Sequence, residues 1–379
     1  LILLSAATWL AAAFLQMIHR DLGFDPHHLM TLSVSLTSEY DDVDRRTRFI
    51  EALVGKVRAL PGVRLAAAAM PTPLAGHQMG ISFEIEGRPS RPGARPTSDM
   101  AIITPGYFAT IATPLVAGRD FDDTDDHRHP RVMIVNQAFA DKFFPGLSPI
   151  GRRIRSGATG PHDDDGSPMR EIVGIVGNAR QAPVALGPEP IYYLPFRQMP
   201  WGAAVLVRSE LAPEALMPAL QRLTSDMDGQ AAVHGLTTFE AMLARGVAGP
   251  QLVVLLMGSF AIIALVLTAT GLYGLLAYGV QQRTREIGVR MALGAMRPTI
   301  VAMVTREALA FVAGGLFVGG LGVLAVTGAL RAQLAVVGPP PALMLAIASA
   351  LVVVTALVSA TVPARRAASV DPTEALRSE

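Results

Sequence analysis

The sequence predicts a membrane α-helical protein with four transmembrane helices in a 1+3 layout and a large extracytoplasmic mixed α/β domain. Four runs contain no charged residue and have 18 or more residues each. A helix needs roughly 20 apolar residues to cross a bilayer. A single polar segment, 19–245, separates the first run from the other three. The runs are Leu1–Ile18, Gly246–Gln282, Ala308–Leu330 and Ala332–Ala364.

The composition fits a polar domain attached to a small membrane bundle. Hydrophobic residues make up 51% of the chain and the mean hydropathy is +0.39, which is high for a purely soluble protein. The formal net charge is +1, without the basic stripe that nucleic acid requires, so we expect no nucleic-acid partner. The chain has no cysteine, which excludes disulfides, thiol catalysis and cysteine-based metal sites.

The distribution of arginines predicts the orientation in the membrane. The segment 281–307 carries five arginines and two glutamates, and the tail 363–379 carries three arginines. The opposite loop, near 331–341, carries a single base. Because cytoplasmic loops are enriched in basic residues, segment 281–307 and the tail are predicted to be cytoplasmic. Four spans then place both chain ends in the cytoplasm and segment 19–245 outside.

The first run, 1–18, is predicted to be transmembrane helix 1. Its first residue is a leucine inside the hydrophobic run, so we expect the natural start of the chain to be missing. A secretory signal is the alternative, because the run has an apolar core and small residues at Ala11–Ala13. The acidic region Asp21–Asp25 is a poor cleavage site, which favours the transmembrane helix.

Two β-α-β pieces bracket the extracytoplasmic domain, 19–245. Alternating residues predict strands, and apolar stripes at helical spacing predict the helices between them. Such a unit prefers parallel strands joined by a right-handed crossover. The first piece comprises strand 31–37, helix 43–60 and strand 63–69; the second comprises strand 203–208, helix 211–223 and strand 231–236. A helix at 238–245 leads from the second piece into the membrane.

A mostly β insertion separates the two pieces. We interpret the pieces as a distant internal repeat that pairs into one sheet. The insertion is predicted to contain strands at 81–86, 100–104, 132–135, 171–176 and 191–194, with short helices at 105–111 and 136–144.

The remaining membrane helices are predicted at 250–280, 308–330 and 342–362. The third contains Gly315 and Gly319 in a G-x-x-x-G pattern, which predicts a close helix-packing face. Gly320–Ala325 fits the looser dinucleotide fingerprint, but its place in a charge-free membrane run argues against cofactor binding.

Sequence signals for catalysis are absent. A Walker A loop needs Gly-Lys followed by Ser or Thr, and the two lysines, Lys56 and Lys142, precede Val and Phe. No G-x-S-x-G or H-E-x-x-H motif is present. The acidic stretches 122–129 and 162–166 contain carboxylates and imidazoles, which are metal-ligand types, but EF-hand spacing fails. We therefore predict solvated turns, no metal, no cofactor and no catalytic residue in this chain.

The cytoplasmic segment 281–307 carries the strongest functional signal. Thr284 is predicted to cap a helix that ends at Gly294, and Pro298 suits the first turn of the next helix. Glu286 and Arg290 are four residues apart in the favourable order for an ion pair on its exposed face, which also carries Arg283. The alternatives are a merely solvated hairpin and a short docking helix that takes force from a cytoplasmic partner.

Several motifs resemble MacB/FtsX-type ABC transporter permeases. Arg285-Glu-Ile-Gly-Val-Arg-Met-Ala-Leu-Gly-Ala295 resembles the coupling motif of that family, and 363–376 resembles its C-terminal signature. Segments 118–121, 132–140, 143–146 and 149–153 resemble its MacB-like extracytoplasmic core domain. The resemblance covers essentially the whole chain, and one unit of the duplicated long-permease subgroup is also compatible with it.

The resemblance implies a non-catalytic permease subunit of the bacterial inner membrane. Two permease subunits or halves would pair with two cytoplasmic ABC ATPase subunits, which hold ATP and Mg and drive the extracytoplasmic domain by mechanotransmission. Membrane lipid and a periplasmic adaptor are further expected partners. The residues implied to contact the ATPase are Arg285, Glu286, Ile287, Arg290, Met291 and Gly294. The first two membrane helices would be the stalk.

The sequence leaves the transported material open. A hydrophobic drug, a peptide and a lipoprotein are candidates, and nothing is transported if the protein activates cell-wall hydrolases. Two rival functions remain: an ATPase-independent membrane sensor or scaffold, and a membrane-tethered hydrolase that uses the acidic stretches. A secondary transporter is disfavoured because such proteins use ionisable residues at the midplane, and these runs have none.

Overall fold

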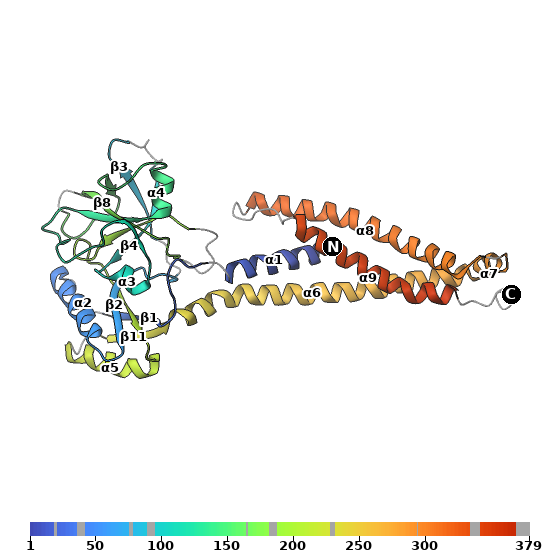
Figure 1. Ribbon diagram of the computed structural model, residues 1–379, viewed down its shortest axis with the longest axis horizontal. Helices are drawn as coiled ribbons and strands as arrows, with labels where there is room; N and C mark the ends of the chain where they lie inside the picture. The colour runs from blue at the N-terminus through green and yellow to red at the C-terminus, as the bar shows by residue number, and fades with distance from the viewer. Residues whose placement is uncertain are drawn as a thin grey trace. The chain divides into compact units, whose positions relative to one another are not determined.

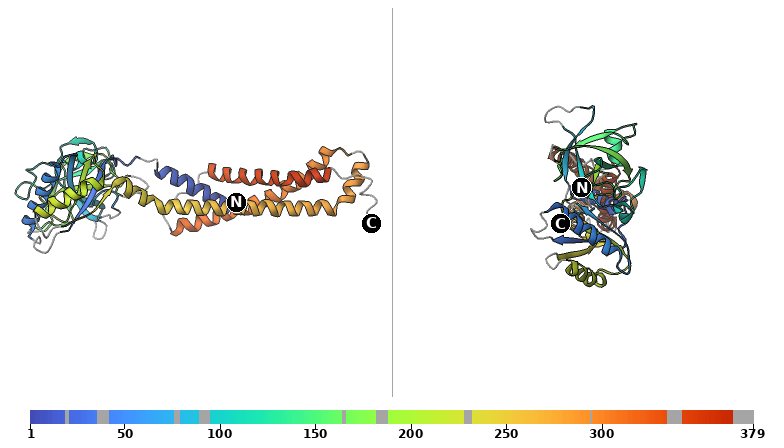
Figure 2. Two further views of the ribbon diagram at one scale, coloured as in Figure 1. Left: turned by 90° about the horizontal axis from the view of Figure 1, so that it is seen from below. Right: turned by 90° about the vertical axis from the view of Figure 1, so that its left-hand side faces the viewer.

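The chain divides into two compact units, shown in a computed structural model (Figures 1 and 2). Leu1–Ile18 and Gly249–Glu379 form the helical unit, and His19–Ala248 form the α/β unit. The structure describes residues 1–18, 21–35, 42–75, 79–88, 95–163, 166–181, 188–227, 232–293, 295–333 and 342–368.

The α/β unit contains one extended sheet and four helices in its described part. The strands are β1 Leu29–Ser35, β2 Val63–Met70, β3 Gly80–Ile85, β4 Thr97–Ile103, β5 Leu115–Gly118, β6 Val132–Asn136, β7 Arg153–Ser156, β8 Met169–Val176, β9 Ile191–Pro195, β10 Ala204–Ser209 and β11 Ala232–Thr238. The helices are α2 Val43–Arg58, α3 Tyr107–Ile111, α4 Gln137–Phe143 and α5 Pro213–Met227.

The two predicted β-α-β pieces pair into one sheet, as expected. Their strands interleave in the order β11-β1-β10-β2, and each neighbouring pair is antiparallel. Within each piece the two strands therefore run parallel, but a strand of the other piece lies between them. Neither piece forms its sheet alone, because each needs a strand from the far end of the domain.

The insertion closes into a ring of paired strands. Starting at β4, the pairing runs through β3, β7, β8, β6 and β9, and β9 pairs back onto β4 in parallel. One hydrophobic cluster receives residues from all six strands, among them Phe83, Met100, Met133 and Tyr192. This arrangement is a small six-stranded barrel whose interior is filled by side chains. Strand β4 also pairs with β2 and so joins the barrel to the first sheet.

Helices cover both faces of the β11-β1-β10-β2 sheet. Helices α2 and α5 pack on one face, where Leu53, Val57 and Leu220 join the same cluster as alternate strand residues. Helix α3 packs on the other face, where Tyr107 and Phe108 join a second cluster. The predicted stripe of α2 is confirmed, since its apolar side chains are buried. Asp42 caps α2 by accepting hydrogen bonds from Asp44 N and Arg45 N.

Two short strands, β5 and β7, were not predicted. Leu115 and Val116 of β5 are exposed, so this strand lacks the alternation of a half-buried strand. Strand β7 has only four residues. Strand β5 pairs with β8 and β7 pairs with β3 and β8, so both depend on strands elsewhere in the chain.

The helical unit contains long apolar helices. Its elements are α1 Ile2–Ile18, most of α6 Phe239–Gln282, α7 Thr284–Ala292, α8 Arg297–Gln333 and α9 Ala342–Ala368. Among the described residues, three helices are long and apolar enough to cross a membrane, and they lie within α6, α8 and α9. Helix α1 is a shorter apolar helix, so a count of four spans stays a prediction. The predicted helix 238–245 is the first part of α6 rather than a separate element.

Candidate functional site

Segment 281–307 contains one short helix between two long ones. Helix α6 ends at Gln282, α7 spans Thr284–Ala292, and α8 begins at Arg297. The predicted cap of α7 is wrong, because Arg283 occupies the cap position and makes no side-chain capping bond. The Thr284 hydroxyl instead donates to Val280 O at 3.1 Å and Gln281 O at 2.9 Å, so it satisfies carbonyls at the end of α6.

The inward face of α7 is apolar. Ile287 is 1% exposed and Met291 is half-buried. Both pack in a cluster with residues of α6, α8 and α9: Leu276, Ile300, Val304, Ala308, Ala360 and Ala364. This packing fixes α7 onto the ends of three long helices, and it places the Ile287 side chain out of reach of a partner chain.

The outward face of α7 carries the predicted ion pair. Arg290 Nη2 donates to Glu286 Oε1 at 2.5 Å, and both side chains are about half exposed. Arg283 donates to Glu307 Oε1 of α8 at 2.5 Å. Arg285 is also exposed. Exposed pairs contribute little to stability, so these charges are available for recognition.

Sequence reasoning missed three exposed apolar side chains within and after the stretch that carries the ion pair. Leu293 is 83% exposed, Met296 is 75% exposed, and Val289 is also exposed. Val289 and Leu293 are at i, i+4, the helical spacing of a second apolar stripe, and Met296 lies beyond the end of α7. Gly294 lies outside the described residues.

The two glycines predicted to pack helices have different surroundings. A Cβ added to Gly319 would lie 2.8 Å from Leu1 Cβ, so α1 approaches α8 closely there. A Cβ added to Gly315 would meet no heavy atom within 4 Å. Gly315 instead lines an apolar cavity of about 740 Å³ between α1, α6 and α8.

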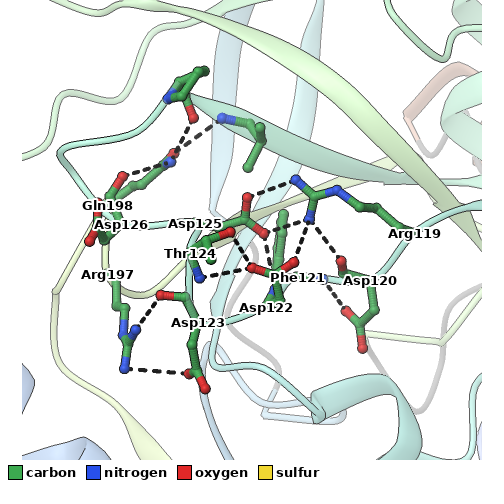
Figure 3. A network of polar contacts seen from close by, with 12 residues as sticks. Arg119, Asp120, Phe121, Asp122, Asp123, Thr124, Asp125, Asp126, Arg197 and Gln198 are labelled. Carbon is green, nitrogen blue, oxygen red and sulfur yellow. Dashed lines mark hydrogen bonds and ion pairs between the residues drawn. The ribbon is translucent and has the colours of Figure 1, made fainter.

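The acidic stretch 122–129 is a tightly bonded turn (Figure 3). Arg119 donates to both carboxylate oxygens of Asp125, at 2.7 and 2.8 Å. Asp125 is buried, and it also accepts from Asp122 N at 3.0 Å. The hydrogen bond to Asp125 raises the pKa of the Arg119 guanidinium above its usual value. The Asp125 carboxylate is thus held by Arg119 and by Asp122 N. It is engaged in structural bonds, which disfavours the hydrolase alternative.

Gln198 bonds the same turn to the rest of the unit (Figure 3). Gln198 is fully buried and its amide donates to Asp126 O at 3.1 Å and Pro130 O at 3.0 Å. Its oxygen accepts from Val132 N at 3.2 Å and Arg170 Nη1 at 3.0 Å. All four hydrogen-bonding positions of this amide are therefore used.

A buried cation lies next to Gln198. Burial lowers the pKa of Arg170 to about 10, and the charge of Asp163 partly opposes this shift. Asp163 pairs with Arg170 at 3.4 Å and with Arg131 at 3.0 Å. The acidic stretch 162–166 thus contributes a structural ion pair, and Asp164 and Asp165 lie outside the described residues. Within the described residues, no group of three or more His, Asp or Glu side chains is arranged to hold a metal ion.

The motifs of segment 118–153 have structural roles in the α/β unit. Asn136 Oδ1 accepts from Phe139 N and Ile191 N, and Asn136 Nδ2 donates to Glu189 O, so it caps α4 and holds the start of β9. Gly118 has φ +79° and an added Cβ would lie 2.2 Å from Val173 O. Only glycine fits this close approach.

This α/β unit, together with three helices able to span a membrane and a short connecting helix, defines a membrane permease with an attached periplasmic-type domain. The family model of the MacB-like periplasmic core domain matches residues 13–223. The model of the FtsX-like permease C-terminal region matches residues 258–372. The chain belongs to the MacB/FtsX family of ABC transporter permeases. Proteins of this family are transport components and are not catalytic on their own.

Curated relatives include two types of exporter. The macrolide export ATP-binding/permease protein MacB of Azoarcus sp. (strain BH72) is 29% identical over 279 residues, covering 70% of this chain and 40% of the relative. The pyoverdine export ATP-binding/permease protein PvdT of Pseudomonas putida KT2440 is 30% identical over 283 residues, covering 70% and 41%. The chain thus spans less than half the length of these relatives. The crystal structure of the periplasmic region of MacB from Actinobacillus actinomycetemcomitans matches 60% of this chain and 95% of that chain, with 12% identity and a TM-score of 0.38.

Proposed function

We propose that this chain is a permease subunit that couples ATP hydrolysis in a separate cytoplasmic ATPase to movement of its α/β unit. The observation that carries this proposal is the outward face of α7 and the turn after it. Leu293 and Met296 expose large apolar side chains and follow the Glu286–Arg290 pair closely in the sequence. An apolar anchor surrounded by charges is typical of a docking surface.

The structure divides the expected contact residues into two groups. Arg285, Glu286 and Arg290 are exposed and are proposed to contact the ATPase. Ile287 and Met291 are proposed to hold α7 against α8 and α9, so that a push on α7 reaches the long helices. Gly294, which lies outside the described residues, stays a proposed ATPase contact by its place in the motif.

The proposed topology follows from the arginines of segment 281–307 and the tail. Both chain ends and α7 are cytoplasmic, and the α/β unit is periplasmic or extracellular, at the bacterial inner membrane. ATP and Mg bind to the partner ATPase. A second permease subunit or half, membrane lipid and a periplasmic adaptor complete the proposed set of partners.

The material handled is proposed only as a class. The relatives are named for macrolide and pyoverdine export, which favours efflux, and lipoprotein or peptide handling is the alternative within the same mechanism. An ATPase-independent sensor or scaffold and a regulator of cell-wall hydrolases are the alternatives to transport.

The test is co-purification of the full chain in detergent with the ATPase encoded beside it, with ATP turnover as the second readout. Glu286→Arg and Leu293→Asp are compared with Leu147→Asp, a matched change at a 53% exposed leucine of the α/β unit. We expect the first two to abolish binding and the altered turnover, and the control to retain both. A folded wild-type chain that neither binds nor alters the ATPase would favour the sensor or scaffold.

A further inference from the structure

We propose that Gly23, Arg208 and Phe239 are positioning residues that join two separate parts of the chain into one rigid joint. The joint consists of segment Asp21–His28, which follows α1 in the sequence, and Phe239–Leu243, the start of α6. Through this joint the movement of the membrane helices would reach the α/β unit as a movement of the whole domain. The transmission of movement rests on the proposed function, but the existence of the joint is tested separately.

Segment Asp21–His28 contains no helix or strand, yet its backbone is bonded to distant elements. Leu22 O accepts from Arg180 N at 2.9 Å, and Gly23 O accepts from the Thr113 hydroxyl at 2.9 Å. Asp25 N donates to Ile111 O at 3.0 Å. These bonds tie the segment to the end of α3 and to the region after β8.

Gly23 allows the chain to lie against the α/β unit. Its φ is +71°, and an added Cβ would lie 1.6 Å from Asn178 O. No other residue fits there without moving backbone atoms. The contact is therefore a close approach of two main chains rather than a loose loop.

Arg208 clamps the same segment from β10. Its guanidinium donates to Asp25 O at 2.8 Å, Asp25 Oδ2 at 3.1 Å and His27 O at 2.8 Å. Its Nε donates to Thr110 O at 2.8 Å. The side chain is largely buried, so these charge-assisted bonds are protected from water.

The start of α6 enters the same site. The Phe24 and Phe239 rings meet edge to face with centroids 5.7 Å apart, and both side chains are buried. Glu240 Oε1 accepts from His28 N at 3.3 Å. The Thr238 hydroxyl accepts from Ala241 N at 3.1 Å and so caps the helix. Segment Asp21–His28 and α6 therefore share a buried aromatic contact, Phe24 with Phe239, and exposed polar contacts of Glu240 with His28 N and the His27 ring.

The physical consequence is that both parts are fixed to the same point of the domain. A flexible linker would absorb the movement of a helix, because its torsions change at little cost. Here the bonds to Gly23, Asp25 and His27 and the burial of Phe239 remove that freedom. Helix α6 starts in the joint at Phe239 and is one helix to Gln282, with Pro250 inside it.

The first experiment is hydrogen–deuterium exchange on the full chain in detergent. Gly23→Ala is compared with Gly87→Ala, because Gly87 also has a positive φ, +75°, but an added Cβ there meets no heavy atom within 4 Å. In Gly23→Ala we expect exchange to quicken by roughly tenfold or more at the amides of Asp25, Arg180 and Ala241, as each lost hydrogen bond weakens protection. Gly87→Ala should leave these amides unchanged.

Faster exchange at Asp25 with no change at Ala241 would overturn the proposal, because the two parts would then be attached independently. If Gly23→Ala unfolds the whole α/β unit, Arg208→Lys provides the same comparison. It keeps a charge beside Asp25 but loses the forked donor geometry. In Arg208→Lys, exchange at the amides of Asp25 and Ala241 is compared in the same way.

The second experiment measures the consequence in the complex with the ATPase. The chain has no cysteine, so spin labels at Leu147→Cys and Tyr278→Cys give one defined pair, one in each unit. In the wild-type background we expect ATP to shift the distance between the two spin labels. In Gly23→Ala most of that shift should be lost, while ATPase binding and basal turnover remain. An unchanged shift in Gly23→Ala would overturn the joint as a positioning device. Absence of any shift or ATPase binding in the wild type would count against the proposed function, and the exchange experiment would still decide the joint.

Discussion

Arg290 donates from Nη2 to Glu286 Oε1 at 2.5 Å, one turn earlier on α7. Its Nη1 contacts the Met303 sulfur of α8 at 3.2 Å. The guanidinium therefore bridges the connecting helix and a membrane helix while keeping one face in solvent. The pair orients the outward face of α7, and the apolar packing beneath it supplies the stability.

Glu286→Gln should therefore change binding more than folding. We expect the free energy of unfolding to fall by no more than about 1 kcal/mol, because exposed ion pairs contribute little. ATPase binding should weaken, since the variant loses a charge on the docking face. Thermal unfolding in detergent and ATPase affinity are the two measurements, and a large loss of thermal stability would contradict this account.

Ile287→Ala should mainly lower stability, whereas Leu293→Ala should mainly weaken ATPase binding. Ile287 is buried among α6, α8 and α9, so its truncation should cost about 2–5 kcal/mol of stability. Leu293 is 83% exposed, and its truncation should change stability by less than about 0.5 kcal/mol while weakening ATPase binding. Hydrogen exchange across α7 and α8 reports the first effect, and co-purification reports the second. Equal destabilisation by the two variants would be inconsistent with the observed packing.

Gly118→Ala should destabilise the α/β unit more than Gly146→Ala. Both glycines have positive φ, +79° and +72°. The added Cβ would collide with Val173 O only at Gly118. We expect Gly146→Ala to cost about 1–2 kcal/mol from the backbone conformation alone, and Gly118→Ala to cost clearly more. The thermal midpoint of the full chain measures the difference, and similar midpoints would count against the close approach.

Asp125→Asn tests the acidic turn of Figure 3. The substitution removes the negative charge that pairs with Arg119 and keeps the side-chain size. Hydrogen bonds to charged groups are worth about 1.5–3 kcal/mol, so we expect a loss of that order in the free energy of unfolding. Asp123→Asn, at an exposed position of the same turn, is the control. Unchanged stability with loss of a hydrolytic activity would revive the hydrolase alternative.

Asp120→Asn should stabilise the α/β unit at neutral pH. Burial raises the pKa of Asp120 above its usual value, and the charge of Asp125 adds to the shift, while the hydrogen bond from Phe121 N opposes it. A carboxyl whose pKa is raised on folding opposes folding when ionised. This cost is present at pH 7, shrinks as the pH falls through the folded-state pKa, and disappears below the unfolded value of 3.8.

The asparagine variant should thus have a higher thermal midpoint than the wild type at pH 7. The two midpoints should converge at pH 3.5. The amide retains the acceptor for Phe121 N, so the change removes mainly the charge. If the wild type were more stable than Asp120→Asn at pH 7, the attraction of Arg119 for the Asp120 carboxylate would outweigh the cost of burying it.

Local sequence patterns account for most individual elements. Apolar spacing placed α2 and α5, and Asn136 followed by Gln-Ala-Phe marked the start of α4. Long runs without charge identified the apolar helices, because a bilayer requires only length and hydropathy. The predicted cap at Thr284 was wrong, because its hydroxyl donates to Val280 O and Gln281 O of the preceding helix instead of accepting from an amide of α7.

The sequence by itself determined the family, the existence of a polar domain before three apolar helices, and the position of the short helix between the first two of them. These are local or compositional properties. Only the tertiary structure decided that the two β-α-β pieces interleave, that Ile287 points inward while Leu293 is exposed, and that Gly23 lies against Asn178. Each of these depends on contacts between residues far apart in the chain, whose pairing is fixed by packing rather than by periodicity.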